Sequence, residues 1–213
     1  MSELDLGRMG LVLNVADDRA HIEQAAEAER LGFSALWLFG GQLELLEPLA
    51  ELLRATKRAA VAPAIVSLDV HGVDDVVSRP GSPQAGACAG TRGILGPDAT
   101  LVVIQPVVLD ADLDRARQTV RGPLGFLLSV GGYAANMRRM GFGDDDIAGM
   151  SDELVDAIAT VGDVDAILAG VRAHLDAGAD HVALSVFSDG GQPGAIEVAR
   201  AVAGADLSLV RAR

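Results

Sequence analysis

Two glycine pairs are the segments whose backbone could bind a phosphate. Gly131-Gly132 precedes an expected helix that begins near Tyr133, and Gly190-Gly191 follows an expected strand that ends near Phe187. Free backbone N–H groups at such a turn bind anions, most strongly beside a helix N-terminus. Neither pair belongs to a complete phosphate-binding loop, and glycine pairs also form plain turns. Both interpretations stay open.

Histidine and cysteine offer little further chemistry. The four histidines are scattered along the chain, so no close pair could chelate a metal: His21, His71, His174 and His181. His71 alone follows the end of an expected strand, where it could hydrogen-bond a cofactor or donate a proton. The alternative is a loop histidine exposed to water. Cys88 is the only cysteine and has no base or partner in its Gly/Ala-rich surroundings, so we expect no disulfide, nucleophile or metal site.

Charged clusters have structural alternatives as well. Arg138-Arg139 could contact an acidic cofactor tail, or could form a solvated helix face. Asp144-Asp145-Asp146 lacks the spacing of a calcium loop and predicts the start of a helix, where carboxylates are favoured by the helix dipole.

The composition is that of a globular protein with an aliphatic core. Of 213 residues, 50% are hydrophobic, 22% are charged and only 3% are aromatic, which excludes disorder and a small disulfide scaffold. The formal charge of −13 argues against nucleic-acid binding. No apolar run approaches the roughly 18 residues of a membrane span, and Glu3 and Asp5 stand where a signal peptide needs positive charge. We expect one cytoplasmic domain over residues 1–213.

The first third alternates buried strands and helices. We expect strands over 10–15, 33–39 and 60–68, separated by helices over 17–32 and 43–58. Such strand–helix–strand units predict a parallel sheet.

The rest of the chain is less regular. A helix begins at 70–77, but glycine and proline make 79–96 an irregular loop. A strand over 99–109 comes next, an apolar run that Gln105-Pro106 interrupts. Asp110, Asp112 and Asp114 open a helix that continues through 120; Gly122-Pro123 interrupts it, and 124–130 could resume it. The final elements expected are helices over 133–140, 151–160, 163–178 and 194–202, and a strand over 181–187. In total we expect about five strands and about seven helices.

Three segments together resemble the luciferase-like monooxygenase family, in its coenzyme F-420-dependent oxidoreductase branch. The most specific is Tyr133–Asp146, YAANMRRMGFGDDD; the others are Leu6–Trp37 and the two stretches 154–162 and 171–182. The resemblance covers about 1–78 and 94–189. It implies an α/β fold, the (β/α)8 TIM barrel, with hydride or oxygen chemistry on FMN or coenzyme F-420.

The chain is short for that barrel, which typically needs ~250 residues and eight strands. The loop at 79–96 stands where the family continues through its middle strands, so we expect a shortened, incomplete barrel. The missing strands could be replaced by the loop, by a second subunit or by nothing. Because a broken barrel exposes strand edges and apolar helix faces, we expect a homo-oligomer.

In such barrels the ligand lies at the C-terminal ends of the strands. The resemblance therefore implies cofactor contacts from Asn14, from Ser67-Leu68 and from Gly190-Gly191, with His71 as a catalytic candidate. In the family the bond at Ser67-Leu68 is often a strained cis peptide that backs the flavin; an ordinary strand end is the alternative. Phe39-Gly40-Gly41 offers no acid after the second strand, and Gln42 is a weak substitute.

Two functions follow as hypotheses. The first is an oxidoreductase that uses coenzyme F-420 or FMN on an unknown small organic substrate, the cofactor carrying the hydride chemistry. The alternative is a non-catalytic shortened barrel that binds a flavin or serves a structural role.

Overall fold

A computed structural model of the protein describes residues 6–15, 18–39, 47–64, 100–129 and 132–210. Several expectations lie outside these residues: the helix start at 70–77, the irregular loop at 79–96, Gln42, Ser67-Leu68, His71 and Cys88. They stay predictions.

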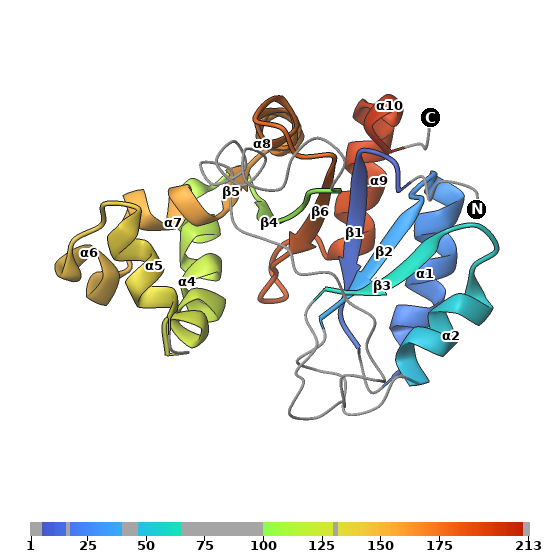
Figure 1. Ribbon diagram of the computed structural model, residues 1–213, viewed down its shortest axis with the longest axis horizontal. Coiled ribbons are helices and arrows are strands. Elements are labelled where there is room, and N and C mark those ends of the chain that lie inside the picture. Colours follow the sequence, from blue (N-terminus) through green and yellow to red (C-terminus); the bar gives the residue numbers. More distant parts are fainter. Residues whose placement is uncertain (1–5, 16–17, 40–46, 65–99, 130–131, 211–213) are drawn as a thin grey trace.

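The described residues form a parallel six-stranded sheet of order β3-β2-β1-β6-β4-β5. The strands are β1 (Met9–Leu13), β2 (Ala35–Leu38), β3 (Ala60–Pro63), β4 (Val102–Leu109), β5 (Thr160–Gly162) and β6 (His181–Val186). β1 and β6 are buried at every residue, as expected of parallel strands covered on both faces. The sheet curls into a half-barrel, which confirms the predicted incomplete barrel (Figure 1).

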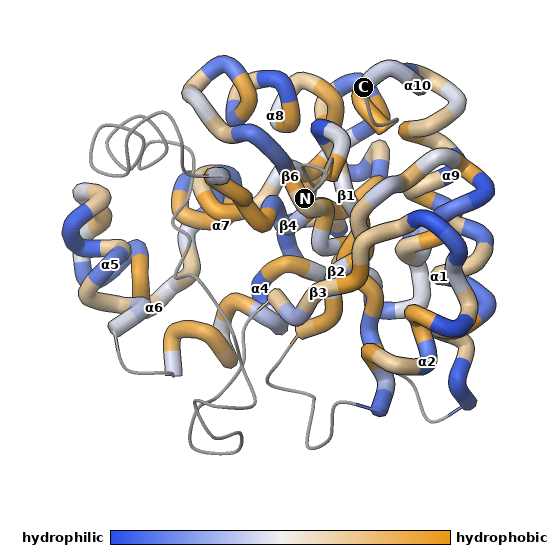
Figure 2. Tube along the Cα trace, turned by 45° about the vertical axis from the view of Figure 1, so that its right-hand side comes forward, coloured by the Kyte–Doolittle hydropathy of each residue, from blue (hydrophilic) through white to orange (hydrophobic). Residues whose placement is uncertain are grey.

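Helices cover this sheet and extend beyond one end of it (Figure 1). They are α1 (Ala20–Leu31), α2 (Glu47–Ala55), α4 (Leu113–Ser129), α5 (Tyr133–Arg139), α6 (Asp144–Gly149), α7 (Asp152–Ile158), α8 (Val164–Asp176), α9 (Ala195–Ala205) and α10 (Leu207–Val210). Hydrophilic residues colour the outer sides of α1, α2 and α9 in Figure 2. None of the helices in the described ranges is long and apolar enough to cross a membrane.

The sheet carries two separate apolar cores. The larger one contains Leu11, Leu184 and Val107, and lies between the sheet and α1, α8 and α9. The second contains Val108, Leu154 and residues of α4–α7. Adjacent residues of a strand point to opposite faces, so Val107 and Val108 place the two cores on opposite sides of β4. Figure 1 shows α4–α7 grouped beyond the β4–β5 end of the sheet.

The strand order differs from that of a sequential barrel. In such a barrel the last strand would lie between the first strand and its own predecessor. Here β4 lies between β6 and β5, so the chain runs outward from β4 to β5 through α4–α7 and then returns past β4 through α8. The second core is formed by α4–α7, the helices of this connection between β4 and β5.

Two sequence expectations were wrong in detail. The strand β5 lies where the end of a helix was expected, so the described residues hold six strands and not five. The helix α4 runs without the expected interruption at Gly122-Pro123, and it includes the segment after Pro123 that could resume it. Val120 and Leu124 both pack into the second core, and this packing overrides the helix-breaking preference of proline.

The strand expected over 99–109 is confirmed as β4, which runs through Gln105-Pro106. The carbonyls of Leu101 and Val107 accept hydrogen bonds from the segment that contains β6. Backbone groups of neighbouring residues in a strand point in opposite directions, so the backbone nitrogen of Pro106 points toward the β5 side. On that side the pairing between β4 and β5 begins only after Pro106, at Val107 with Thr160. The missing N–H of Pro106 therefore costs no ladder bond.

Candidate functional site

The C-terminal ends of the parallel strands meet at one edge of the half-barrel, where ligands of such barrels bind. Asn14 directly follows β1 at this edge and is exposed. Gly190 and Gly191 are exposed in the turn that follows β6. The structure thus brings these three predicted residues to the same edge of the sheet, and whether they bind a cofactor stays a prediction.

The turn after β6 is held by its own side chains. The Gly190 N–H donates to Ser188 Oγ over 3.2 Å, and the Gly191 N–H donates to Asp189 Oδ1 over 2.9 Å. Gly190 has a positive φ of 96°, which favours glycine. Both amides that were expected to meet a phosphate therefore already have acceptors, and an anion at Gly191 would have to displace the Asp189 carboxylate.

Gln192 and Thr119 connect this turn to α4. The buried Gln192 side chain accepts the Asp189 N–H over 3.2 Å and donates to Thr119 Oγ1 over 2.9 Å. Thr119 Oγ1 also lies 3.4 Å from Asp189 Oδ2. Hydrogen bonds thus join the turn to α4, a helix that contributes residues to the second core.

Asp110 is a buried carboxylate at the same edge, directly after β4. It accepts two hydrogen bonds from Arg115, from Nε and Nη2, each over 2.7 Å. The Arg115 guanidinium and the Asp112 N–H lower the pKa of Asp110 to about 2. Asp110 is therefore ionised at neutral pH and anchors the start of α4 to the sheet.

This pairing predicts a pH-dependent stability. Because the pKa of Asp110 is lower in the folded protein than its ordinary value of 3.8, its ion pair stabilises the fold above about pH 4 and loses that effect as the pH falls toward about 2. We expect Asp110→Asn to lower the melting temperature at pH 7, with the difference from wild type shrinking toward pH 2.

Thermal unfolding followed by circular dichroism between pH 2 and pH 7 measures this difference. Asp114→Asn is the matched control, because Asp114 is 94% exposed and pairs with Arg117 at 3.6 Å. Its difference from wild type should stay small across the range. A pH-independent difference for Asp110→Asn would contradict the assignment.

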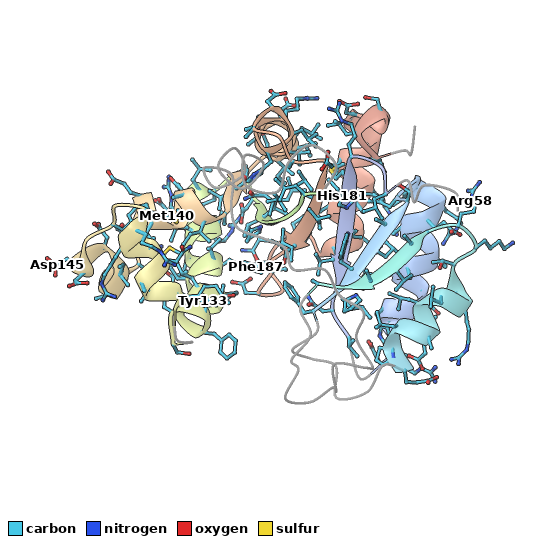
Figure 3. The ribbon with its side chains drawn as sticks, viewed as in Figure 1. Arg58, Tyr133, Met140, Asp145, His181 and Phe187 are labelled. Atoms are coloured by element: carbon cyan, nitrogen blue, oxygen red, sulfur yellow. The ribbon has the colours of Figure 1, made fainter. Side chains whose placement is uncertain are left out.

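His181 lies at the opposite end of the strands, in a structural role. Its Nδ1 contacts the Gly7 carbonyl at 2.9 Å, and its Nε2 accepts the Trp37 indole N–H over 3.1 Å. Burial lowers the pKa of His181, against the opposing effect of the Gly7 bond. The ring is therefore neutral and carries its proton on Nδ1. Figure 3 shows it within the sheet, beside β1.

Two further histidines are also buried. His174 on α8 bonds to the Gln105 side chain, and burial lowers the pKa of His174. His21 on α1 lies 3.2 Å from Glu51 of α2. No cluster of His, Cys, Asp and Glu suited to a metal ion occurs within the described ranges.

The remaining candidates lie on the helical group. Arg138 pairs with Asp144 at 2.7 Å, and Arg139 donates to Asn136. The three aspartates 144–146 form the first turn of α6, which confirms the predicted helix start. Gly132 is the residue before α5, with a positive φ of 98°.

Sequence reasoning missed the polar residues that organise this edge: Asp110, Arg115, Thr119 and Gln192. Asp110 was interpreted as a helix opener alone. The available signal was an acid, an arginine and a threonine at positions 110, 115 and 119, next to a strand end. Their common partner, Gln192, lies too far along the chain for any periodic pattern to connect it with them.

Comparisons with known proteins show the fold. No protein-family model matches the sequence, and no curated protein is a significant match. Among solved structures, an F-420-dependent secondary alcohol dehydrogenase in complex with an F-420–acetone adduct matches with a TM-score of 0.65 and 10% identity, over 95% of this chain and 99% of that one.

A second solved structure agrees. The coenzyme F-420-dependent tetrahydromethanopterin reductase from Methanopyrus kandleri matches with a TM-score of 0.58 and 12% identity, over 97% of this chain and all of that one (100%). At these identities the likeness concerns the fold alone. It confirms the predicted α/β fold, a parallel sheet curled into a half-barrel.

Proposed function

We propose that the protein is an oxidoreductase that uses coenzyme F-420, or else FMN, on a small organic substrate. The observation that carries the proposal is the fold match, over 95% and 97% of the chain, to two proteins whose activities depend on F-420. Fold alone does not determine function, so the residues at the C-terminal edge supply the second argument.

The described edge suits an uncharged, hydrogen-bonding part of a cofactor. Asn14 offers an exposed amide beside β1, and Ser188 and the glycine turn lie beside β6. Two cations near this edge are already paired, Arg115 with Asp110 at 2.7 Å and Arg19 with Glu51. Asn14 and the turn would therefore hold ring or hydroxyl groups more readily than a phosphate.

When bound, F-420 or FMN supplies the site that donates or accepts a hydride. The chain's own residues would then bind and orient the ring. His71 stays the proposed residue for proton transfer to or from the substrate, as the sequence predicts.

Ligand binding tests the proposal directly. Purified protein is titrated with F-420 and, separately, with FMN, and the quenching of ligand fluorescence is followed. We expect a dissociation constant on the order of micromolar for one of the two ligands. Absence of binding by both would end the oxidoreductase hypothesis.

A variant locates the binding edge. Asn14→Ala should weaken binding by about fivefold, the effect of one net hydrogen bond. Asn136→Ala is the control, because Asn136 is a half-buried asparagine on α5, in the group of helices beyond the β4–β5 end of the sheet. Equal affinities for both variants would place the ligand elsewhere. With binding established, F-420 reduction by a panel of secondary alcohols examines the substrate class.

The non-catalytic alternative has one observation in its favour. Asp110 is paired with Arg115, and Gln192 with Thr119 and Asp189, so these polar groups at the edge already stabilise the fold. A protein that bound neither ligand but kept this network would fit that role.

Self-association is also proposed. The described sheet is open and ends at β3 and β5, and open sheet edges favour pairing with another chain. Sedimentation at moderate salt should show a dimer or larger species; a monomer would contradict this.

A further inference from the structure

Hydrogen bonds of Gln192 join the turn after β6 to α4: two are made with the turn and one with the helix. The Gln192 side-chain oxygen accepts the Asp189 N–H over 3.2 Å, and its backbone carbonyl accepts the Ser188 hydroxyl over 2.8 Å. Its side-chain amide donates to Thr119 Oγ1 over 2.9 Å. The Gln192 side chain is 8% exposed, whereas Asp189, Gly190 and Gly191 are exposed. A buried side chain thus supports an exposed turn.

Thr119 is the other half of this link. It lies on α4 between Ala116 and Val120, two residues of the second core. Its hydroxyl contacts Gln192 and Asp189 as well as the Arg115 carbonyl of its own helix. The turn after β6 is therefore tied to a rigid, packed helix that is distant in sequence.

We propose that Gln192 and Thr119 are positioning residues, which fix the Ser188–Gly191 turn in the shape that a ligand meets at the C-terminal edge of the sheet. This inference rests on the proposed function, because it assumes that a cofactor binds at this edge. The two residues act through the turn and do not themselves touch the ligand.

The physical reason is the conformational freedom of the turn. Two consecutive glycines have many accessible backbone conformations, and ordering them on binding reduces affinity. A turn held in advance by Gln192 and Thr119 avoids that loss. Removing the link should therefore weaken ligand binding and loosen the turn in the ligand-free protein.

The test compares two buried threonines. Thr119→Val removes a hydroxyl that bonds both to its own helix and to Gln192. Thr56→Val is the matched control, because Thr56 is buried and its hydroxyl donates to the Leu52 carbonyl over 2.9 Å, four residues back in the chain, as Thr119 does toward Arg115. Thr119→Ser, which keeps the hydroxyl, is the conservative rescue. Gln192→Leu is a second variant that removes the link from the other side.

Two quantities are measured: the affinity for F-420 by fluorescence, and hydrogen exchange of the 188–191 amides in the ligand-free protein. For Thr119→Val and Gln192→Leu we expect affinity to fall and exchange to accelerate by about fivefold or more, the effect of at least one lost hydrogen bond. Thr119→Ser and Thr56→Val should stay near wild type in both.

The outcomes separate this inference from the proposed function. If wild type binds F-420 and both link variants bind it equally well, the positioning role is overturned while the proposed function stands. Unchanged exchange in the turn overturns the positioning role as well. If the wild-type protein binds neither F-420 nor FMN, the proposed function fails, and this inference falls with it.

Discussion

Gly10→Ala is expected to destabilise the protein by about 3 kcal/mol, at the upper end of the usual range for overpacking a core. Gly10 lies in β1, between β2 and β6. A Cβ built there would lie 2.4 Å from His181 Nε2 and 2.9 Å from the Ala35 carbonyl oxygen. Both distances are far below van der Waals contact, so the neighbours would have to move.

Neither neighbour can move easily. Ala35 belongs to β2, which is paired on both sides. The His181 ring is held at Nδ1 by Gly7 and at Nε2 by Trp37, and it is 1% exposed. Displacing it would leave the Trp37 indole N–H without its acceptor, a further loss of about 1–3 kcal/mol if no other acceptor replaces it. Gly10 is thus required because the imidazole covers its Cα.

Urea denaturation followed by circular dichroism measures the change in the free energy of unfolding. Gly125→Ala is the matched control: Gly125 lies within α4, and its added Cβ would meet Met150 Sδ at an ordinary 3.8 Å. There the same substitution should stabilise the protein by about 0.5–1 kcal/mol, because alanine favours a helix interior. The free energy of unfolding should therefore fall in Gly10→Ala and rise in Gly125→Ala. Changes of similar size and sign in the two variants would contradict the assigned packing.

The regular part of the fold was predictable from local patterns. β1 and β2 are continuous apolar runs, and β6 is apolar except at His181 and Ser185, because a parallel strand covered on both faces needs apolar side chains in both directions. β5 was missed because Thr160-Val161-Gly162 is too short to show any period. The interruption expected at Gly122-Pro123 was wrong because the continuity of α4 depends on the packing of Leu124 in a core that the sequence pattern did not distinguish.

For the candidate site, the sequence predicted its location at the C-terminal edge of the sheet but not the side-chain contacts there. Because the C-terminal ends of parallel strands lie at one edge of the sheet, Asn14 and Gly190 are expected at the same edge. The pairing of Asp110 with Arg115, and of Gln192 with Thr119, depends on how α4 lies against the turn after β6. That geometry comes from the strand order, with β4 beside β6, which short-range reasoning did not supply.

Because the protein has two apolar cores, we expect a leucine-to-alanine substitution to affect different parts of the fold in each core. Leu154 in the second core and Leu184 in the larger core are both fully buried at 0% exposure. Truncation of either to alanine should destabilise its own surroundings by about 2–5 kcal/mol. Leu184 belongs to β6, the strand that joins β1 to β4, so its loss should weaken the whole sheet.

Leu154→Ala should instead act locally. The second core is built from α4–α7 with Val108, and Phe187 packs against it between β6 and the helices (Figure 3). Hydrogen exchange under native conditions distinguishes the two variants, since local opening and global unfolding expose different amides. We expect Leu154→Ala to accelerate exchange in α4–α7 while β1 and β6 stay protected, and Leu184→Ala to accelerate it throughout. The same exchange pattern in both variants would mean that the helices and the half-barrel unfold as one cooperative unit, with α4 bound to the sheet more tightly than the separate cores imply.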